Sequence, residues 1–490
     1  MSKSSLQPVS RGLSFAEYLK HDALGLAELV RKGETTADEL LEIALARLEV
    51  VNPLINAVVD TFTDKARKEI AGGLSNGPFT GVPYLLKDLF IDLKGTKTTS
   101  GAVFLKDVVA KRDSTIAERY RKAGLVIFGK THSPEFGSAP ATESRLYGVT
   151  RNPWNTDYSA GGSSGGSSAA VAAGIVPAAN GSDAGGSIRT PSATCGLFGL
   201  KPTRGRAPLG PARFDGGGGI ATVHALTRSV RDSAALLDVV AGIELGASYA
   251  SPVQVRPYLE EAQHDPPRLR IAVMTQPFTK DAVNADVLTS VADAEKLCEA
   301  LGHTVEEATP SIDADLFAWT RKVLKAAAAV TGIHNSERAL GRKATEQEFE
   351  PNTWESYRQG LSLTAEDIMR AREAMFVLHR QVAEFMADYD MILTPATACG
   401  PFPVGTLGPV HVGPEADAGR RRLSCFTALA NLTGQPAMSV PLFWNDAGMP
   451  IGVQFWARFA AEDMLFQLAG QLERARPWFN RLPKMTLEAS

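Results

Sequence analysis

The chain has 490 residues, of which 44% are hydrophobic and 21% charged, a composition typical of a globular protein with a substantial core. Its 51 Lys and Arg against 54 Asp and Glu give a net charge of −3, so we expect no broad attraction to nucleic acid. The cysteines show neither CxxC nor metal-ligand spacing, which argues against a disulfide framework and a structural zinc site. They are Cys195, Cys298, Cys399 and Cys425.

The N-terminal residues contain no apolar stretch of the kind found in secretory signals. The most apolar segment, residues 169–179, is interrupted by Gly174 and Pro177 and is too short to span a bilayer, which takes about 20 apolar residues. We therefore expect a cytoplasmic protein that does not associate with membranes.

The first 55 residues have a helical pattern. Thr36 and Glu39 form a capping-box spacing, and Pro53 is expected to end the helix that follows. The apolar positions of this helix fall on one face: Leu40, Leu41, Ala44 and Leu48.

From Gly81 to about residue 150 the pattern alternates between strand and helix. Residues 82–91 form a nearly continuous apolar run around one lysine, residues 114–123 are helical, and residues 125–128 indicate a buried strand. This alternation predicts an α/β sheet layered with helices.

Residues 159–219 are rich in glycine, but blocks of alanine and valine separate the glycines. A flexible linker lacks such blocks, so we expect tightly packed backbone within a domain. The last part, residues 208–219, ends in four consecutive glycines and has two interpretations: a mobile flap over a pocket, or a disordered surface loop.

A modest boundary falls near residues 263–267. Beyond it we expect a strand at 269–273 and a helix at 285–301, then a mostly helical cap or insertion over 311–390. Strand-like sequence returns at Met391 and continues to about residue 455.

Several catalytic motifs are absent, including HExxH, the P-loop and a strand-preceded GxGxxG. One motif matches in spelling: Gly161 to Gly165 fits GxSxG, the nucleophile elbow of α/β-hydrolases, with Ser163 at its centre. That elbow needs a buried strand before the serine, whereas residues 152–158 are polar and turn-forming. An esterase that uses Ser163 as its nucleophile is therefore kept as an alternative.

Three segments stand out together: GVPYLLKD with Lys87, GGSSGG at residues 161–166, and GSDAGGSIR at residues 181–189. In this order and spacing they resemble the amidase signature family. Blocks further along the chain are also similar to that family: residues 195–203, 432–441 and 448–454.

The resemblance extends over about residues 14–475 and implies an α/β amidase signature fold, with a central mixed sheet of many strands covered by helices on both faces. It implies one domain, residues 1–490, with four successive parts. These are N-terminal helices (14–55), a catalytic core (70–260), a strand with a largely helical insertion (267–390) and a return to the core sheet (391–475).

Within the family, residues 51–57, 77–88 and 150–155 look like hydrolases of cyclic nylon oligomers. Aryl acylamidases and urethanases are further plausible relatives. Some members instead hydrolyse glutamine as a subunit of tRNA-dependent amidotransferases, which remains an alternative. A binding protein with an inactive site would require loss of Lys87, Ser163 or Ser187, and all three are present.

Ser187 is the expected nucleophile, and a serine needs a neighbouring base. His132 is the only histidine near the motif, so Lys87 is the candidate, provided that its apolar strand keeps it neutral by desolvation. The alternative is that Lys87 pairs with Asp88, but strand alternation points Asp88 to the opposite face.

By resemblance, Ser163 follows a cis peptide bond after Gly162 and relays protons between Ser187 and Lys87. Ser164 is the nearest competitor for this role. The resemblance also assigns an oxyanion hole to four backbone amides and an ion pair that braces the turn. The amides are those of Ala184, Gly185, Gly186 and Ser187, and the ion pair is Asp183 with Arg189.

These roles imply acyl transfer through an acyl-enzyme, with no metal or organic cofactor. The sequence shows no charge cluster that demands an ionic substrate, so we expect uncharged, largely apolar linear or cyclic amides or anilides, with possible carbamate (urethane) and ester hydrolysis. The expected partner is the small-molecule substrate alone, for a monomer or homodimer.

Overall fold

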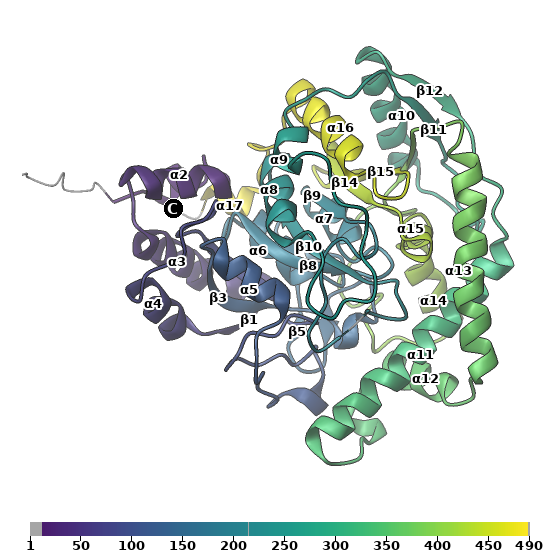
Figure 1. Ribbon diagram of the computed structural model, residues 1–490, viewed down its shortest axis with the longest axis horizontal. Coiled ribbons are helices and arrows are strands. Elements are labelled where there is room, and N and C mark those ends of the chain that lie inside the picture. Colours follow the sequence, from purple (N-terminus) through teal and green to yellow (C-terminus); the bar gives the residue numbers. More distant parts are fainter. Residues whose placement is uncertain (1–11, 214, 489–490) are drawn as a thin grey trace, which may run out of the picture.

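The computed structural model describes residues 12–213 and 215–488, and its centre is a mixed sheet of 11 strands (Figure 1). From one edge to the other the strands are β1 (Val58–Thr61), β3 (Val126–Thr131), β2 (Pro83–Lys87), β8 (Ala178–Asp183), β10 (Thr222–Thr227), β9 (Phe198–Lys201), β14 (Ala437–Trp444), β15 (Pro450–Ala457), β13 (Met391–Pro395), β11 (Arg270–Val273) and β12 (Thr304–Glu307). Two small ribbons lie outside it, formed by β4 (Glu143–Ser144) with β5 (Gly148–Val149) and by β6 (Arg151–Asn152) with β7 (Asn155–Ser159).

The sheet has parallel pairs near both edges and antiparallel pairs elsewhere. Strands β3, β2 and β8 run parallel, as do β13, β11 and β12. The strands in the middle, from β8 to β13, pair antiparallel. The expected α/β fold with a central mixed sheet is thus confirmed.

Helices cover both faces of the sheet. On β2, Tyr84 and Leu86 join one apolar cluster while Leu85 joins another, as the two-residue period of a strand requires. The first face is covered mainly by α2 (Ala23–Lys32), α5 (Thr115–Lys122), α8 (Val230–Val240), α9 (Tyr258–Glu261), α10 (Ala285–Ala300) and α16 (Glu462–Ala475). The second is covered by α3 (Ala37–Ile55), α4 (Thr63–Ala71), α6 (Gly165–Ala172), α7 (Arg189–Cys195), α11 (Ala314–Leu340), α13 (Ala365–Phe385) and α15 (Ala428–Thr433).

On the second face the core is divided. One apolar cluster lies over β1 to β8 and includes Leu85, and another lies over β11, β13 and β15 and includes Trp456. Two residues away on the same strands, after Leu85 and before Trp456, the side chains on the same face are buried but polar, namely Lys87 and Gln454. The seam between the two clusters is therefore the polar part of this face.

A helical layer stands at the side of the molecule opposite α2, α3 and α4 (Figure 1). It consists of the 27-residue α11 with α12 (Pro351–Gly360) and α13, which pack against one another. This is the helical insertion expected from residues 311–390. Among the described residues, no helix combines the length and apolarity needed to cross a membrane.

Two sequence predictions about element ends were wrong. Pro53 lies inside the last turn of α3, which ends at Asn56, a residue in the left-handed region with φ 49°. A proline two residues before the end of a helix removes only one backbone hydrogen bond of the last turn and is tolerated there. The capping box of Thr36 and Glu39 is confirmed.

The strand-like sequence after Met391 is also interrupted. Two helices, α14 (Pro414–Arg422) and α15, stand between β13 and β14. Short apolar runs do not distinguish a buried strand from a buried helix, and α15 is buried at every position.

Candidate active site

Lys87 ends β2 with its side chain fully buried in the seam of the second face. Its Nζ lies 2.7 Å from Ser163 Oγ, 2.9 Å from Ser164 Oγ and 3.0 Å from Ser182 Oγ. Burial lowers the pKa of this amine to about 7, and the charge of Asp183 opposes the shift only partly. A substantial fraction of Lys87 is therefore neutral near pH 7 and able to accept a proton.

Asp88 is not the partner of Lys87. Its carboxylate accepts hydrogen bonds from the backbone N–H of Thr99, at 2.7 Å, and from the Thr99 hydroxyl. Successive residues of a strand point to opposite faces of the sheet, so the Asp88 side chain points away from the seam. Lys87 forms no salt bridge with any carboxylate that the structure describes.

The loop before α6 brings Ser163 to Lys87. The peptide bond between Gly162 and Ser163 is cis, as the family resemblance implies, and Ser163 is almost fully buried. The next amide, Ser164 N–H, donates to the carbonyl of Ser187 at 3.2 Å. One hydrogen bond thus joins the loop that carries Ser163 to the segment that carries Ser187.

Ser187 is partly exposed, as are Ala184 and Gly185, whereas Lys87 and Ser163 are buried. Its Oγ forms no hydrogen bond with any residue in the described part of the chain, so the link from Ser187 to Ser163 is not closed here. An accessible hydroxyl beside a buried relay is what a nucleophile requires, because the substrate must reach Oγ.

The backbone of residues 184–187 offers fewer free amide donors for an oxyanion hole than expected. Gly186 N–H already donates to Asp183 Oδ1 at 2.7 Å, so the prediction that it also serves an oxyanion does not fit this arrangement. The amides of Ala184, Gly185 and Ser187 donate to no other described residue. These three amides remain available to a ligand.

Asp183 and Arg189 form a buried bidentate ion pair. The Arg189 Nη2 donates to Asp183 Oδ1 at 2.9 Å and Nε donates to Oδ2 at 3.0 Å, and both side chains are fully buried. Burial alone would raise the pKa of Asp183, but the guanidinium outweighs it and holds that pKa well below its usual range. The pair fixes the turn that carries Ser187, because Asp183 also accepts from Gly186 and Ile188 N–H.

Sequence reasoning missed the residues that complete this ion pair. Asn431 Nδ2 donates to Asp183 Oδ1 at 3.0 Å, and its Oδ1 accepts from Arg189. Gln454 Oε1 accepts from Arg189 Nη1 at 2.6 Å. Gln454 lies in a segment that resembles the family and Asn431 directly precedes another, but more than 200 residues separate each from Arg189, so no local spacing links them to it.

The glycine run after residue 214, which itself lies outside the described residues, is a hydrogen-bonded turn. The carbonyl of Gly216 accepts from the N–H groups of Gly219, Ile220 and Ala221, and Arg204 donates to the Gly219 carbonyl. These contacts argue against a disordered surface loop, and the mobile flap stays a prediction.

The GxSxG alternative lacks its structural context. Strand β7, before Ser163, pairs with β6 and forms one isolated bridge with Pro403, and it lies outside the central sheet. The ring of His132 binds Thr150 and Ser144 at 2.8 Å each, so it is already engaged away from Ser163. The geometry favours lysine over histidine as the base.

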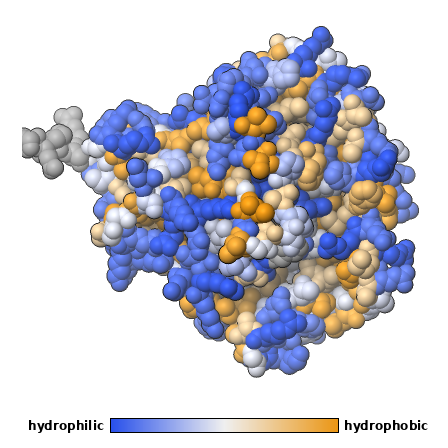
Figure 2. Space-filling view, viewed as in Figure 1, coloured by the Kyte–Doolittle hydropathy of each residue, from blue (hydrophilic) through white to orange (hydrophobic). Residues whose placement is uncertain are grey.

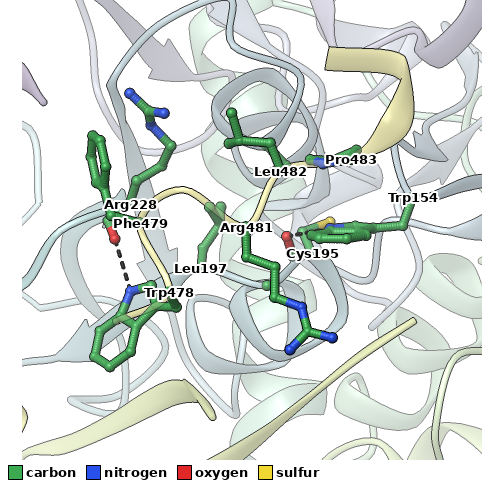
Figure 3. A pocket seen from close by; sticks show the side chains of 11 residues that line it. Trp154, Cys195, Leu197, Arg228, Trp478, Phe479, Arg481, Leu482 and Pro483 are labelled. Carbon is green, nitrogen blue, oxygen red and sulfur yellow. Dashed lines mark hydrogen bonds between the residues drawn. The ribbon is translucent and has the colours of Figure 1, made fainter. Parts of the chain in front are cut away.

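Other possible sites do not join this centre. In the described residues no group of His, Cys, Asp and Glu side chains could hold a metal ion. A small pocket lies at the far end of α7, lined by Trp154, Cys195 and the C-terminal residues Trp478 and Arg481 (Figure 3). Since α7 runs from Arg189 to Cys195, a whole helix separates this pocket from Ser187.

Comparison with known proteins agrees with this geometry. A family model described as amidase matches residues 39–466. The 6-aminohexanoate-cyclic-dimer hydrolase of Paenarthrobacter ureafaciens is 38% identical over 480 residues, which cover 95% of this chain and 97% of that enzyme.

Solved structures give the same picture. A 6-aminohexanoate cyclic dimer hydrolase complexed with substrate superposes with a TM-score of 0.91 at 37% identity, covering 96% of this chain and 99% of that one. A bacterial aryl acylamidase of the amidase signature family superposes with a TM-score of 0.87 at 26% identity, covering 96% and 99%.

Proposed function

This chain belongs to the amidase signature family of amide-hydrolysing enzymes, and we propose that Lys87, Ser163 and Ser187 perform its hydrolysis. One observation carries the proposal: the buried Lys87 amine has no carboxylate partner among the described residues and lies 2.7 Å from Ser163 Oγ. A neutral amine in that position accepts the Ser163 proton, and Ser163 in turn accepts the proton of Ser187.

The reaction then has two acyl-transfer steps. Ser187 Oγ attacks the substrate carbonyl as its proton passes through Ser163 to Lys87, and collapse of the tetrahedral intermediate breaks the C–N bond while the relay returns the proton to the leaving amine. Water next attacks the acyl-enzyme with the same proton path, releasing the acid and restoring Ser187.

The negative charge of each tetrahedral intermediate falls on the former carbonyl oxygen. We assign its stabilisation to the amides of Ala184, Gly185 and Ser187, which have no other acceptor among the described residues. One such donor contributes about 2.7–4 kcal/mol in the transition state. The Asp183–Arg189 pair holds these amides in place and does not exchange protons.

For the substrate we propose linear or cyclic amides or anilides, with carbamates (urethanes) and esters as further substrates. The similarity to a cyclic-dimer hydrolase and to an aryl acylamidase supports the first two classes. Carbamates and esters follow from the chemistry, because an acyl-enzyme forms from each. The cytoplasmic location and the monomeric or homodimeric state stay predictions.

The test measures release of p-nitroaniline from a short acyl p-nitroanilide and from an alkyl N-(p-nitrophenyl)carbamate, with Ser187→Ala as the blank. We expect release that vanishes in the variant, and the ratio of the two rates separates anilide from urethane hydrolysis. Folded protein that releases nothing but hydrolyses glutamine would instead favour the amidotransferase-subunit alternative.

A further inference from the structure

One face of α11 lies near segments of the candidate active site. Arg321, Lys325 and Gly332 are spaced by four and seven residues, which places them along one stripe of the helix. At its far end this stripe meets the ring of Phe136, 3.8 Å from where a Cβ on Gly332 would lie. Phe136 in turn precedes Gly137, whose added Cβ would lie 3.0 Å from Ser163 Oγ.

Arg321 reaches the oxyanion side of the site. Its Nη2 donates to Ser424 Oγ at 2.9 Å. Three residues further on, Thr427 Oγ1 donates to the carbonyl of Gly185 at 2.7 Å. The segment 424–427 thus connects the Arg321 guanidinium to the backbone of Gly185 through two hydrogen bonds.

Lys325 reaches the opposite side. Its Nζ donates to Asn352 Oδ1 at 3.2 Å, and Asn352 Nδ2 donates to the carbonyl of Ser138 at 3.2 Å. Ser138 follows Gly137, which abuts Ser163. The two cations of α11 are therefore linked to two different segments of the candidate site, one next to Gly185 and the other next to Ser163.

Neither cation is neutralised by the protein. Within residues 12–213 and 215–488, Arg321 and Lys325 form no salt bridge, and the acidic group that faces Lys325, Asp417, is bound to Arg420 at 2.5 Å. Lys325 is open to solvent, yet burial, with help from Arg420, lowers its pKa to about 8.

Two cations without a counter-ion, on a helix linked by hydrogen bonds to segments on both sides of the candidate site, favour an anion from outside. We propose that Arg321 and Lys325 bind a carboxylate carried by the substrate, several bonds away from the scissile amide. The inference rests on the proposed function, and it replaces the expectation of an uncharged substrate, which the sequence could not test because no local charge cluster marks these two residues.

The test measures binding to the Ser187→Ala variant by calorimetry, so that turnover does not interfere. Two pairs of ligands place the carboxylate on either side of the amide: the mono-p-nitroanilide of adipic acid against its methyl ester, and 4-(hexanoylamino)benzoate against its methyl ester. We expect the acid of at least one pair to bind about tenfold more tightly, the effect of one charge-assisted hydrogen bond.

Arg321→Gln and Lys325→Met, each added to Ser187→Ala, should remove most of this preference. Lys322→Met is the matched control, because Lys322 is the exposed lysine next to Arg321 on the same helix and should leave the preference unchanged. Equal binding of acid and ester in both pairs, or a preference that survives both substitutions, would overturn the proposal.

Failure of the proposed function would look different. Wild-type turnover of the neutral p-nitroanilide methyl ester reports the chemistry independently of the carboxylate. If the wild type hydrolyses neither ester, yet Ser187→Ala still prefers the acid, the proposed chemistry is wrong and the carboxylate site stands.

Discussion

Two surfaces meet at Ser187, and they differ in how they are built. The buried side, with Lys87, Ser163 and the Asp183–Arg189 pair, consists of side chains whose polar groups bind one another at 2.7–3.0 Å. The α11 side presents the partly exposed Arg321 and the exposed Lys325, which have no counter-ion among the described residues. The side chains of the first surface, apart from the Ser187 hydroxyl, find their hydrogen-bond partners within the protein, whereas the two cations of the second have no counter-ion there.

The contrast assigns different tasks to the two surfaces. A closed network of buried hydrogen bonds holds reacting groups in one geometry, which acyl transfer needs whatever the substrate is. Unpaired charges at the rim discriminate between substrates instead. Changes on the buried side should therefore affect all substrates alike, whereas changes on α11 should change their ranking.

The largest effect should come from the relay. Lys87→Ala and Ser187→Ala should each lower kcat/KM for every substrate by about a thousandfold or more, with the double variant little worse than either, because residues of one relay act as a unit. Single-turnover rates with an anilide and a carbamate measure this. Losses that add fully would show that the two residues do not share a proton path.

The ion pair should matter most for stability. Arg189→Met leaves the Asp183 carboxylate buried without its partner, and we expect it to lower the free energy of unfolding by about 3–5 kcal/mol. Urea denaturation measures the change. Arg380→Met is the control, since Arg380 and Glu384 form an exposed pair one helical turn apart, and its effect should be small.

A loss in Arg189→Met no larger than that in Arg380→Met would contradict the bracing role. Because the pKa of Asp183 is lowered in the folded protein, the pair stabilises the protein above the ordinary carboxylate pKa. That contribution should disappear as the pH falls through the lowered value.

The pH dependence sharpens the assignment of the base. Lys87 must lose its proton to act, so kcat/KM for an uncharged anilide should rise through pH 7, level off above it and fall about tenfold per unit below it. Lys201 is also buried with a pKa lowered to about 7, and Lys201→Met should keep the same midpoint. A flat profile from pH 6 to 9, with chemistry rate-limiting, would exclude Lys87.

The smallest effects are expected from two glycine substitutions, one next to Ser163 and one on α11. Gly137 has φ +65°, and an added Cβ would lie 2.8 Å from Leu89 and 3.0 Å from Ser163 Oγ, so Gly137→Ala should lower kcat about tenfold. Gly332→Ala is the matched control in a helix interior with room for the methyl group, and it should raise stability by about 0.5–1 kcal/mol. Equal kcat losses in both variants would contradict this distinction.

The buried side was largely predictable from the sequence. Lys87, Ser163 and Ser187 stand in short segments of distinctive composition, and Asp183 and Arg189 are close enough in sequence to suggest their pairing. The sequence of a segment does not show which backbone amides already donate a hydrogen bond within the protein. The hydrogen bond from Gly186 to Asp183 depends on the path of the turn, so Gly186 was wrongly included among the oxyanion donors.

The α11 side was not predictable. Arg321 and Lys325 have ordinary neighbours on a charged helix, and only the packing of α11 against residues 352 and 424 gives them a common direction. The same holds for Gln454, whose contact with Arg189 depends on strand pairing across the sheet. The interrupted strand pattern after Met391 failed for a related reason, since burial and not periodicity decides between strand and helix there.

The contact between Arg189 and Gln454 has a consequence for synthesis of the chain. Ribosomes add roughly 5–20 residues per second, so residue 454 follows residue 189 by roughly 15–50 s. Its strand, β15, inserts between β14 and β13, which are both made earlier. During that interval the nascent chain carries every residue of the proposed relay but lacks the strand that contacts Arg189, so we expect hydrolytic activity to begin only when translation is nearly finished.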